Sequence, residues 1–263
     1  MNWIRKHISL LGIILYMLVT LSLVSGKMNN VLCENVNINI NDSLKAGFIE
    51  PQEVVNLLKT MEVKLWGYPV YDIPAAEVEN VVKNNMPFAE DVCAWADVHG
   101  DFHIDLTQRN PIARVVLQDG QSYYIGEKGY LLPLSPNYSS RVLVVSGDVF
   151  QKIPGNGNIT IDSLVRIKGP ENTMIDEIYE MAAYINQDSL LKRQIEQIFV
   201  KQNEFELIPK VGTHTIEFGS VDDLLNKFFK LKVIYYKGFS NLGWNKYSRV
   251  NLKYKNQVVC TKR

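Results

Sequence analysis

The sequence predicts an α+β protein in which an apolar N-terminal segment precedes two folded domains. Three observations predict this organisation. Residues 8–25 contain no charged side chain, and residues 31–108 follow the order strand, helix, helix, strand, strand. From about residue 109 to residue 263 the chain reads mainly as short strands separated by turns. This pattern is typical of a small helix-on-sheet module followed by a larger β-rich domain.

The composition sets limits on the class of protein. The 263 residues are 46% hydrophobic, which excludes a disordered or collagen-like chain. Since 28 basic residues balance 28 acidic ones, the whole-chain charge gives no argument for nucleic-acid binding. Cys33, Cys93 and Cys260 lack CxxC spacing, so neither a disulfide framework nor a Cys-rich zinc site is expected.

The apolar run predicts insertion into a membrane. As a helix, its 18 residues would be about 27 Å long, close to the thickness of a bilayer core. Arg5 and Lys6 precede the run, and this charge favours a cytoplasmic N-terminus. A cleavable secretory signal is the alternative, since Val24-Ser25-Gly26 resembles a cleavage site. Both interpretations place the chain from Lys27 onward outside the cytoplasm.

The small module shows clear periodic patterns. Alternation within Val31–Ile40 predicts a strand, and Pro51 begins a helix with apolar residues three and four positions apart. A second helix follows Pro74 and stops at Met86-Pro87. Val92–Trp95 and Phe102–Leu106 then predict a hairpin.

The second domain is predicted from turn residues and β-branched runs. Asp119-Gly120 indicates a hairpin between two short strands. The further predicted strands are Arg141–Val145, Ile195–Lys201, Phe205–Val211, Val233–Lys237 and Arg249–Val259. Helices are predicted at about Asn172–Asn186 and from Ser220 to Phe229.

Candidate catalytic and metal-binding residues are few. His99 and His103 lie four apart with Asp101 and Asp105 between and beyond them, which could suggest metal ligands. On a strand these four share the face opposite Phe102, and no third histidine is near, so we expect a solvated face rather than a metal site. Cys93 is expected to be buried in its strand. The sequence therefore predicts no catalytic site, no metal, no cofactor and no small-molecule substrate.

The C-terminal end is the segment with a plausible binding role. Lys227–Arg263 contains ten Lys/Arg and no Asp or Glu, among many aromatic residues. Lysines on a terminal strand can simply prevent edge-to-edge aggregation. Alternatively, an open edge can accept a partner strand, with the cations selecting an acidic partner. Nucleic acid and anionic lipid are weaker alternatives for an exported chain.

Several segments, taken in order, resemble the FtsQ/DivIB family of bacterial cell-division proteins, in the form found in the Bacteroidetes group. The matching segments are Gln108–Val115, Tyr123–Ser135, Tyr138–Gly147, Phe205–Gly212, Ile216–Gly219, Gly243–Tyr247 and Val250–Tyr254. Gly126 departs from the pattern, because the family usually has Asp there.

The resemblance implies a specific organisation. It implies a cytoplasmic head at residues 1–7, an uncleaved transmembrane helix at 8–26, a POTRA domain at 27–108 and a β domain at 109–263. The implied protein is a non-enzymatic, single-pass inner-membrane scaffold of the divisome, with its C-terminal domain in the periplasm. The implied partners are FtsB-like and FtsL-like single-pass proteins and the septal wall-synthesis machinery.

In this family a partner strand adds to the last β-strand of the protein, and the contact positions correspond here to Tyr254, Asn256 and Gln257. The basic, alternating segment identified above is the same one. The predicted partner-binding residues are Arg249, Asn251, Lys253, Tyr254, Lys255, Asn256, Gln257 and Val258.

Overall fold

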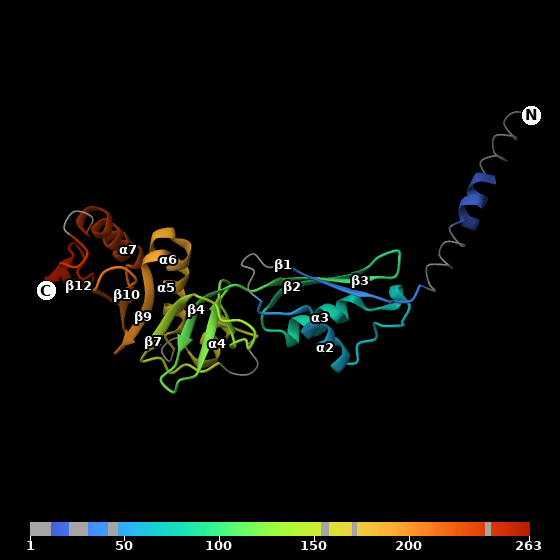
Figure 1. The fold of residues 1–263 in the computed structure, drawn as a ribbon, viewed down its shortest axis with the longest axis horizontal. Coiled ribbons are helices and arrows are strands. Elements are labelled where there is room, and N and C mark those ends of the chain that lie inside the picture. Colours follow the sequence, from blue (N-terminus) through green and yellow to red (C-terminus); the bar gives the residue numbers. More distant parts are fainter. Residues whose placement is uncertain (1–11, 21–30, 42–46, 154–157, 170–172, 240–242) are drawn as a thin grey trace, which may run out of the picture. The chain divides into compact units, whose positions relative to one another are not determined.

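The chain divides after Gln108 into two compact units, each with its own sheet. The computed structural model describes residues 12–20, 31–41, 47–153, 158–169, 173–239 and 243–263 (Figure 1). Residues 8–11 and 21–26 of the predicted membrane segment, 8–26, lie outside these ranges, as does the predicted head at 1–7; residues 12–20 are helical. Within the described ranges, no helix has both the length and the apolar character needed to span a bilayer.

The first unit is a three-stranded sheet with helices on one face (Figure 1). Its elements are β1 (Val36–Asn41), α2 (Pro51–Thr60), the short helix η1 (Val70–Asp72), α3 (Ala75–Asn85), β2 (Ala89–Ala96) and β3 (Phe102–Gln108). The central strand β3 runs parallel to β1 and antiparallel to β2. The predicted order of elements is confirmed.

Local sequence explains these elements. Pro51 occupies the first turn of α2, where its missing N–H removes no helical hydrogen bond. Val54 and Leu58 of α2 are fully buried, as are Val78 and Val82 of α3, because their spacing places each pair on one face of its helix. The register of β2 alternates, with Ala94 buried and Cys93 on the opposite, exposed face. The expectation that Cys93 is buried was therefore wrong.

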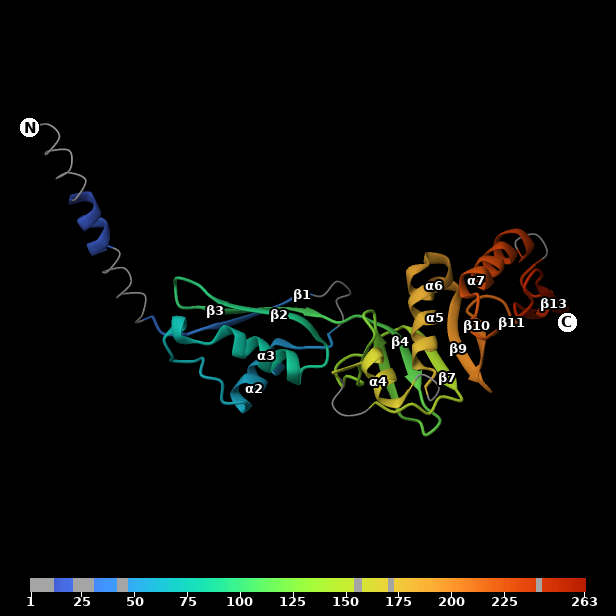
Figure 2. The ribbon, with the colours of Figure 1, turned by 180° about the vertical axis from the view of Figure 1, so that it is seen from behind.

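The second unit is built on a ten-stranded sheet, shown from behind in Figure 2. The strand order is β13-β12-β11-β10-β9-β7-β4-β5-β6-β8. The first strands are β4 (Pro111–Val116), β5 (Ser122–Gly126), β6 (Tyr130–Leu132), β7 (Leu143–Gly147) and β8 (Ile159–Thr160). They are followed by β9 (Ile195–Lys201), β10 (Glu204–Pro209), β11 (Thr215–Gly219), β12 (Tyr247–Asn251) and β13 (Val259–Lys262).

Helices of the second unit contribute to the same core as the strands. They are α4 (Ile161–Lys168), α5 (Ile175–Gln187), α6 (Ser189–Gln194), α7 (Leu224–Val233) and the π-helix η3 (Ile234–Phe239). Buried side chains of α5, such as Met181 and Ala182, belong to one cluster with Ile198 of β9 and Phe205 of β10. The hairpin at Asp119-Gly120 is confirmed by the pairing of β4 with β5.

Two strand predictions in this unit were wrong. Val233–Lys237 is helical, because α7 continues directly into η3, where Tyr235 and Phe239 are buried. The predicted strand Arg249–Val259 is interrupted: β12 ends at Asn251 and β13 begins at Val259. Two short helices, α4 and α6, were not predicted.

Candidate functional site

At the C-terminal end of the large sheet, the edge strand is β13 and not the segment that begins at Arg249. Strand β12 is paired on both sides, parallel to β11 and antiparallel to β13. In the part of the chain that the structure describes, β13 is the last strand at this end of the sheet (Figure 2). Its outer backbone groups are therefore the ones that an additional strand could pair with.

Hydrogen bonding identifies which backbone groups point outward. The N–H of Arg263 donates to the carbonyl oxygen of Lys246, on the β12 side, at 3.3 Å. In an antiparallel pair, alternate residues direct both backbone groups to the same neighbour. The extra residue of the register shift lies in β12, because Tyr247 and Arg249 face the consecutive residues Lys262 and Thr261 of β13. The alternation along β13 is therefore uninterrupted. The N–H and C=O groups of Cys260 and Lys262 consequently face away from β12.

The break between β12 and β13 has a tertiary cause. After β12 the side chain of Leu252 is fully buried, and the N–H of Lys253 donates to Asn251 Oδ1 at 2.9 Å. Lys230 Nζ of α7 donates to the carbonyl oxygens of Leu252 and Tyr254, at 3.2 and 2.7 Å. These contacts hold the chain in a turn. Two of its carbonyl oxygens accept hydrogen bonds from a lysine of α7 instead of from a neighbouring strand.

The predicted partner-binding residues lie around this turn. Arg249 and Asn251 are in β12, and the other six, from Lys253 to Val258, form the turn that leads into β13. The Tyr254 side chain is 50% exposed, and Val259 at the start of β13 is 42% exposed. None of the predicted residues lies in β13 itself, and the prediction did not include Lys230.

Part of the positive charge at this end is neutralised within the protein. Glu217 accepts hydrogen bonds from Arg249 Nη1 at 3.1 Å and from Asn251 Nδ2 at 2.6 Å. Lys253 forms an ion pair with Glu204. Within the described chain, Lys255 and Lys262 form no ion pair, so they are among the cations beside the edge that remain available to a partner.

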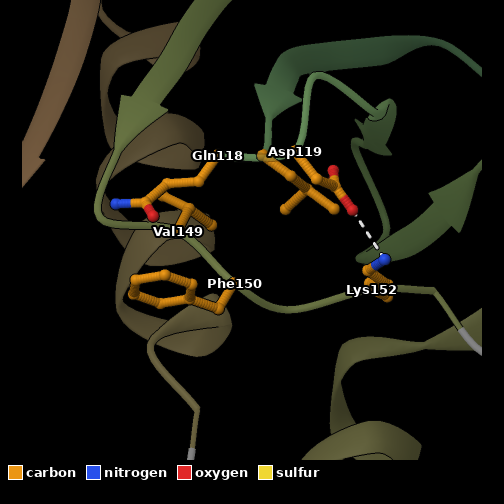
Figure 3. A pocket seen from close by; sticks show the side chains of 6 residues that line it. Gln118, Asp119, Val149, Phe150 and Lys152 are labelled. Atoms are coloured by element: carbon orange, nitrogen blue, oxygen red, sulfur yellow. Dashed lines mark ion pairs between the residues drawn. The ribbon is translucent and has the colours of Figure 1, made fainter.

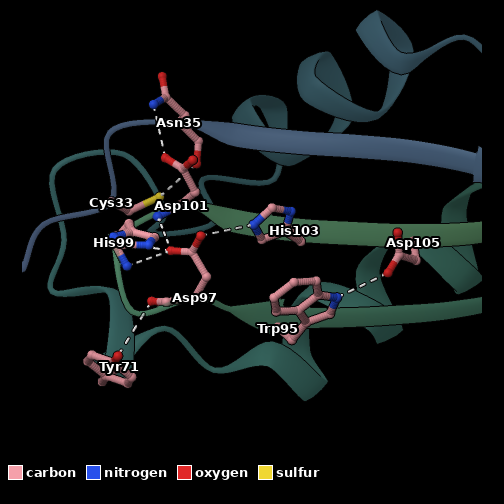
Figure 4. A network of polar contacts seen from close by, with 10 residues as sticks. Cys33, Asn35, Tyr71, Trp95, Asp97, His99, Asp101, His103 and Asp105 are labelled. Carbon is pink, nitrogen blue, oxygen red and sulfur yellow. Dashed lines mark hydrogen bonds and ion pairs between the residues drawn. The ribbon is translucent and has the colours of Figure 1, made fainter.

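The histidine-containing segment of the first unit forms a polar network on the open face of its sheet (Figure 4). Asp97 Oδ1 accepts hydrogen bonds from the N–H groups of His99, Gly100 and Asp101, at 2.8, 3.0 and 3.0 Å. Asp97 Oδ2 lies 3.5 Å from His103 Nε2. Partial desolvation acts to raise the pKa of Asp97, but hydrogen bonds from Asp101 and His99 together with His103 hold this pKa below its usual range.

The structure brings together only two of the four residues that the sequence suggested as metal ligands. Asp101 and His103 lie close to each other and to Asp97. Asp105 instead accepts hydrogen bonds from Trp95 Nε1 at 3.0 Å and from Asn39 Nδ2 at 3.2 Å. The side chain of His99 does not take part. The sequence favours a cap or a solvated face for Asp97, as for Asp101, and the three backbone hydrogen bonds to Asp97 Oδ1 are those of a turn cap. The approach of Asp97 to His103 was not predicted.

A surface hollow of about 350 Å³ lies beside the β4–β5 hairpin (Figure 3). Asp119 and Lys152 form an ion pair of 2.6 Å at its rim, and the Phe150 side chain is 67% exposed. The hydrogen bond from Lys152 lowers the pKa of Asp119, although desolvation acts in the opposite direction. The side chains that line the hollow include no histidine, serine or cysteine, so they offer no nucleophile–base pair of the kind used in acyl transfer.

Comparison with known families accounts for both units. A model described as FtsQ/DivIB, C-terminal related, matches residues 110–261, and a POTRA-like domain model matches residues 31–107. A comparison with curated proteins finds no match. Because the first model alone covers more than half of the chain, and because the three-stranded unit has the α+β architecture of the second, the chain belongs to the FtsQ/DivIB family of cell-division proteins.

Proposed function

We propose that this protein is a single-pass membrane scaffold of the bacterial divisome. Residues 8–25 anchor it in the inner membrane with the N-terminus in the cytoplasm, and the two folded units act in the periplasm. It links FtsB-like and FtsL-like single-pass proteins to the septal wall-synthesis machinery without catalysing a reaction. Membership of the FtsQ/DivIB family supports the role in cell division.

The helical residues 12–20 support the anchor. The seven side chains from Ile13 to Val19 are all apolar or aromatic, and each is between 48% and 71% exposed. Such a surface is costly in water and favourable in a bilayer. Intact-mass analysis of the protein from membranes tests this proposal directly: an uncleaved chain is expected, whereas a mature chain beginning near Lys27 would instead favour a secreted β-rich binding protein or enzyme.

The binding mechanism that we propose is strand addition at β13. The observation that carries it is the free outer edge, with backbone groups of Cys260 and Lys262 directed away from β12. An extended partner segment would pair with these groups, and the turn from Lys253 to Val258 would contact the partner's side chains. Lys255 and Lys262 would favour an acidic segment.

Photo-crosslinking in dividing cells tests this mechanism. A photoreactive residue is placed at Tyr254, Gln257 or Thr261, with Lys192 on α6 as a control position in the same unit. We expect the three edge positions, but not the control, to capture an FtsB-like protein through its extended segment. Capture of that protein only from positions outside the turn and β13 would refute strand addition at this edge while leaving the divisome role intact.

A further inference from the structure

We propose that Asp97, Asp101 and His103 form a binding site for one Zn²⁺ ion at the end of the β2–β3 hairpin. This inference concerns the POTRA-like unit and is independent of the partner edge on the other unit. It rests on one imidazole and two carboxylates that converge from the turn and from β3 (Figure 4).

The separation of His103 and Asp97 fits a shared metal ion, and Asp101 lies nearby. One ligand atom from each of the three residues lies within 4.8 Å of the other two. His103 Nε2 and Asp97 Oδ2 are 3.5 Å apart, at the long end of the range for a hydrogen bond or ion pair. Bond lengths of about 2.0–2.1 Å around tetrahedral zinc place two ligand atoms about 3.3 Å apart. The observed separation is therefore close to that of two atoms sharing one zinc ion.

The network around Asp97 limits how it can bind a metal. Its Oδ1 atom already accepts three backbone hydrogen bonds, so Oδ2 is the atom left to act as a ligand. Asp101 Oδ1 accepts a hydrogen bond from Asn35 Nδ2 at 3.0 Å. Single-oxygen binding by Asp97 fits zinc better than calcium, which takes six to eight oxygen ligands and often a bidentate carboxylate. Water would complete the coordination.

Neighbouring side chains orient the candidate ligands. The indole ring of Trp95 stacks on the ring of His103, with a centroid distance of 4.1 Å and an angle of 12°. Trp95 is in turn held by its hydrogen bond to Asp105, which Asn39 also contacts. Such outer contacts fix the ring of a metal-binding histidine and contribute to affinity. The sequence has no third histidine near His99 and His103, and in the structure the third member of the cluster is Asp97.

Zinc titration of the metal-free full-length protein in detergent, against a chromophoric chelator, tests this site. We expect one ion to bind per chain. Asp97→Asn retains Oδ1 for the turn but replaces Oδ2 with an amide nitrogen, and His103→Gln removes the imidazole; each should weaken binding about tenfold or more. His99→Ala is the matched control, since His99 lies in the same turn but is not one of the three clustered residues, and the zinc affinity of this variant should be unchanged.

Two further measurements separate ligand loss from unfolding. Circular dichroism reports whether each variant is folded; if Asp97→Asn is not, Asp101→Asn together with His103→Gln decides the question. Co²⁺ binding to the wild-type protein should give the visible absorption of a four-coordinate ion. Absence of saturable zinc binding, unchanged affinity in folded ligand variants, or loss of binding in His99→Ala would overturn the proposal.

Discussion

The POTRA-like unit and the end of the large sheet carry opposite charge. Residues 31–108 contain thirteen Asp/Glu and four Lys/Arg, whereas residues 227–263 contain ten Lys/Arg and no acidic residue. Several cations of the second group form ion pairs within their own unit. Arg249, Lys253 and Lys232 pair with carboxylates of the same unit, so the count of cations overstates the charge offered to a partner. Net charge alone therefore does not show which groups at this end of the sheet are open to a partner, whereas the unpaired edge of β13 does.

The two units also differ in how they place histidine. His103 in the first unit lies on an open sheet face beside two carboxylates. His214 in the second is 2% exposed and surrounded by the rings of Tyr235, Phe239 and Trp244. The first arrangement suits a ligand site and the second a packed core.

The largest expected effect is a loss of stability that is confined to the second unit. Gly147 at the end of β7 has a φ of 104°, and a Cβ atom there would lie 2.0 Å from the Val200 carbonyl oxygen. Gly147→Ala should therefore destabilise the second unit by about 3 kcal/mol or more, through backbone strain and overpacking. Domain-resolved hydrogen exchange during denaturant unfolding would measure this loss.

Protection of the POTRA-like unit against hydrogen exchange should not change in Gly147→Ala. Gly67→Ala, in the POTRA-like unit, is the contrasting variant: a Cβ atom there has no other atom within 4 Å, so only the positive φ opposes the change. An equal loss of protection in both units of Gly147→Ala would show that they unfold as one, against the division after Gln108.

Acid should destabilise the second unit selectively through His214. Burial lowers the pKa of His214 to about 4. The unfolded chain binds this proton below about pH 6.5, whereas the folded unit does not until about pH 4. Stability is therefore complete above pH 6.5 and falls by up to about 3 kcal/mol as the pH decreases through this window. Denaturant unfolding followed at successive pH values measures the slope.

Matched histidine variants sharpen this prediction. His214→Gln removes the titrating group and should flatten the pH dependence of the second unit, even if the variant is less stable at neutral pH. His99→Gln changes an exposed histidine of the other unit and should leave the slope intact. A slope that persists in His214→Gln would assign the acid sensitivity to other groups.

A smaller effect is expected from one backbone donor of β13. Cys260→Pro removes the outward N–H and should weaken partner binding by about 1–2 kcal/mol, while pairing with β12 is kept. Cys260→Ala changes the same side chain but retains the N–H, and should bind like the wild type. Calorimetric titration with the partner's extended segment measures both; equal affinities for Pro and Ala would argue against main-chain pairing.

The smallest effect is expected from charge at the edge. Replacing Lys255 and Lys262 by Glu should slow association at low salt, with a change in binding free energy below about 1 kcal/mol. The same change at Lys192 and Lys201, elsewhere in the second unit, is the control. Stopped-flow association at two salt concentrations distinguishes them, and identical salt dependence in all variants would show that charge does not steer the partner.

Local sequence predicted the parts of the fold whose signals are local. Pro51 and Pro74 predicted the starts of α2 and α3, and Asp119-Gly120 predicted the hairpin in the large sheet. The β-branched and aromatic residues of Val233–Lys237 favoured a strand, but η3 buries Tyr235 and Phe239 against His214, and this packing overrides local propensity.

The candidate sites depended on contacts between distant residues. The break after β12 requires Lys230 of α7, more than twenty residues away in sequence, so alternation alone could not reveal β13 as the edge. Likewise, the cluster with His103 requires Asp97 from the preceding hairpin arm. The alternating sequence pattern therefore could not identify which backbone and side-chain groups of these two segments face outward.

Residue-resolved hydrogen exchange of β13, with and without the partner's extended segment, tests strand addition most directly. The amides of Cys260 and Lys262 face away from β12, whereas the amide of Arg263 already donates to Lys246. On binding, we predict a strong gain in protection at Cys260 and Lys262. A complex that forms with these two amides still exchanging as in the free protein would contradict strand addition at this edge.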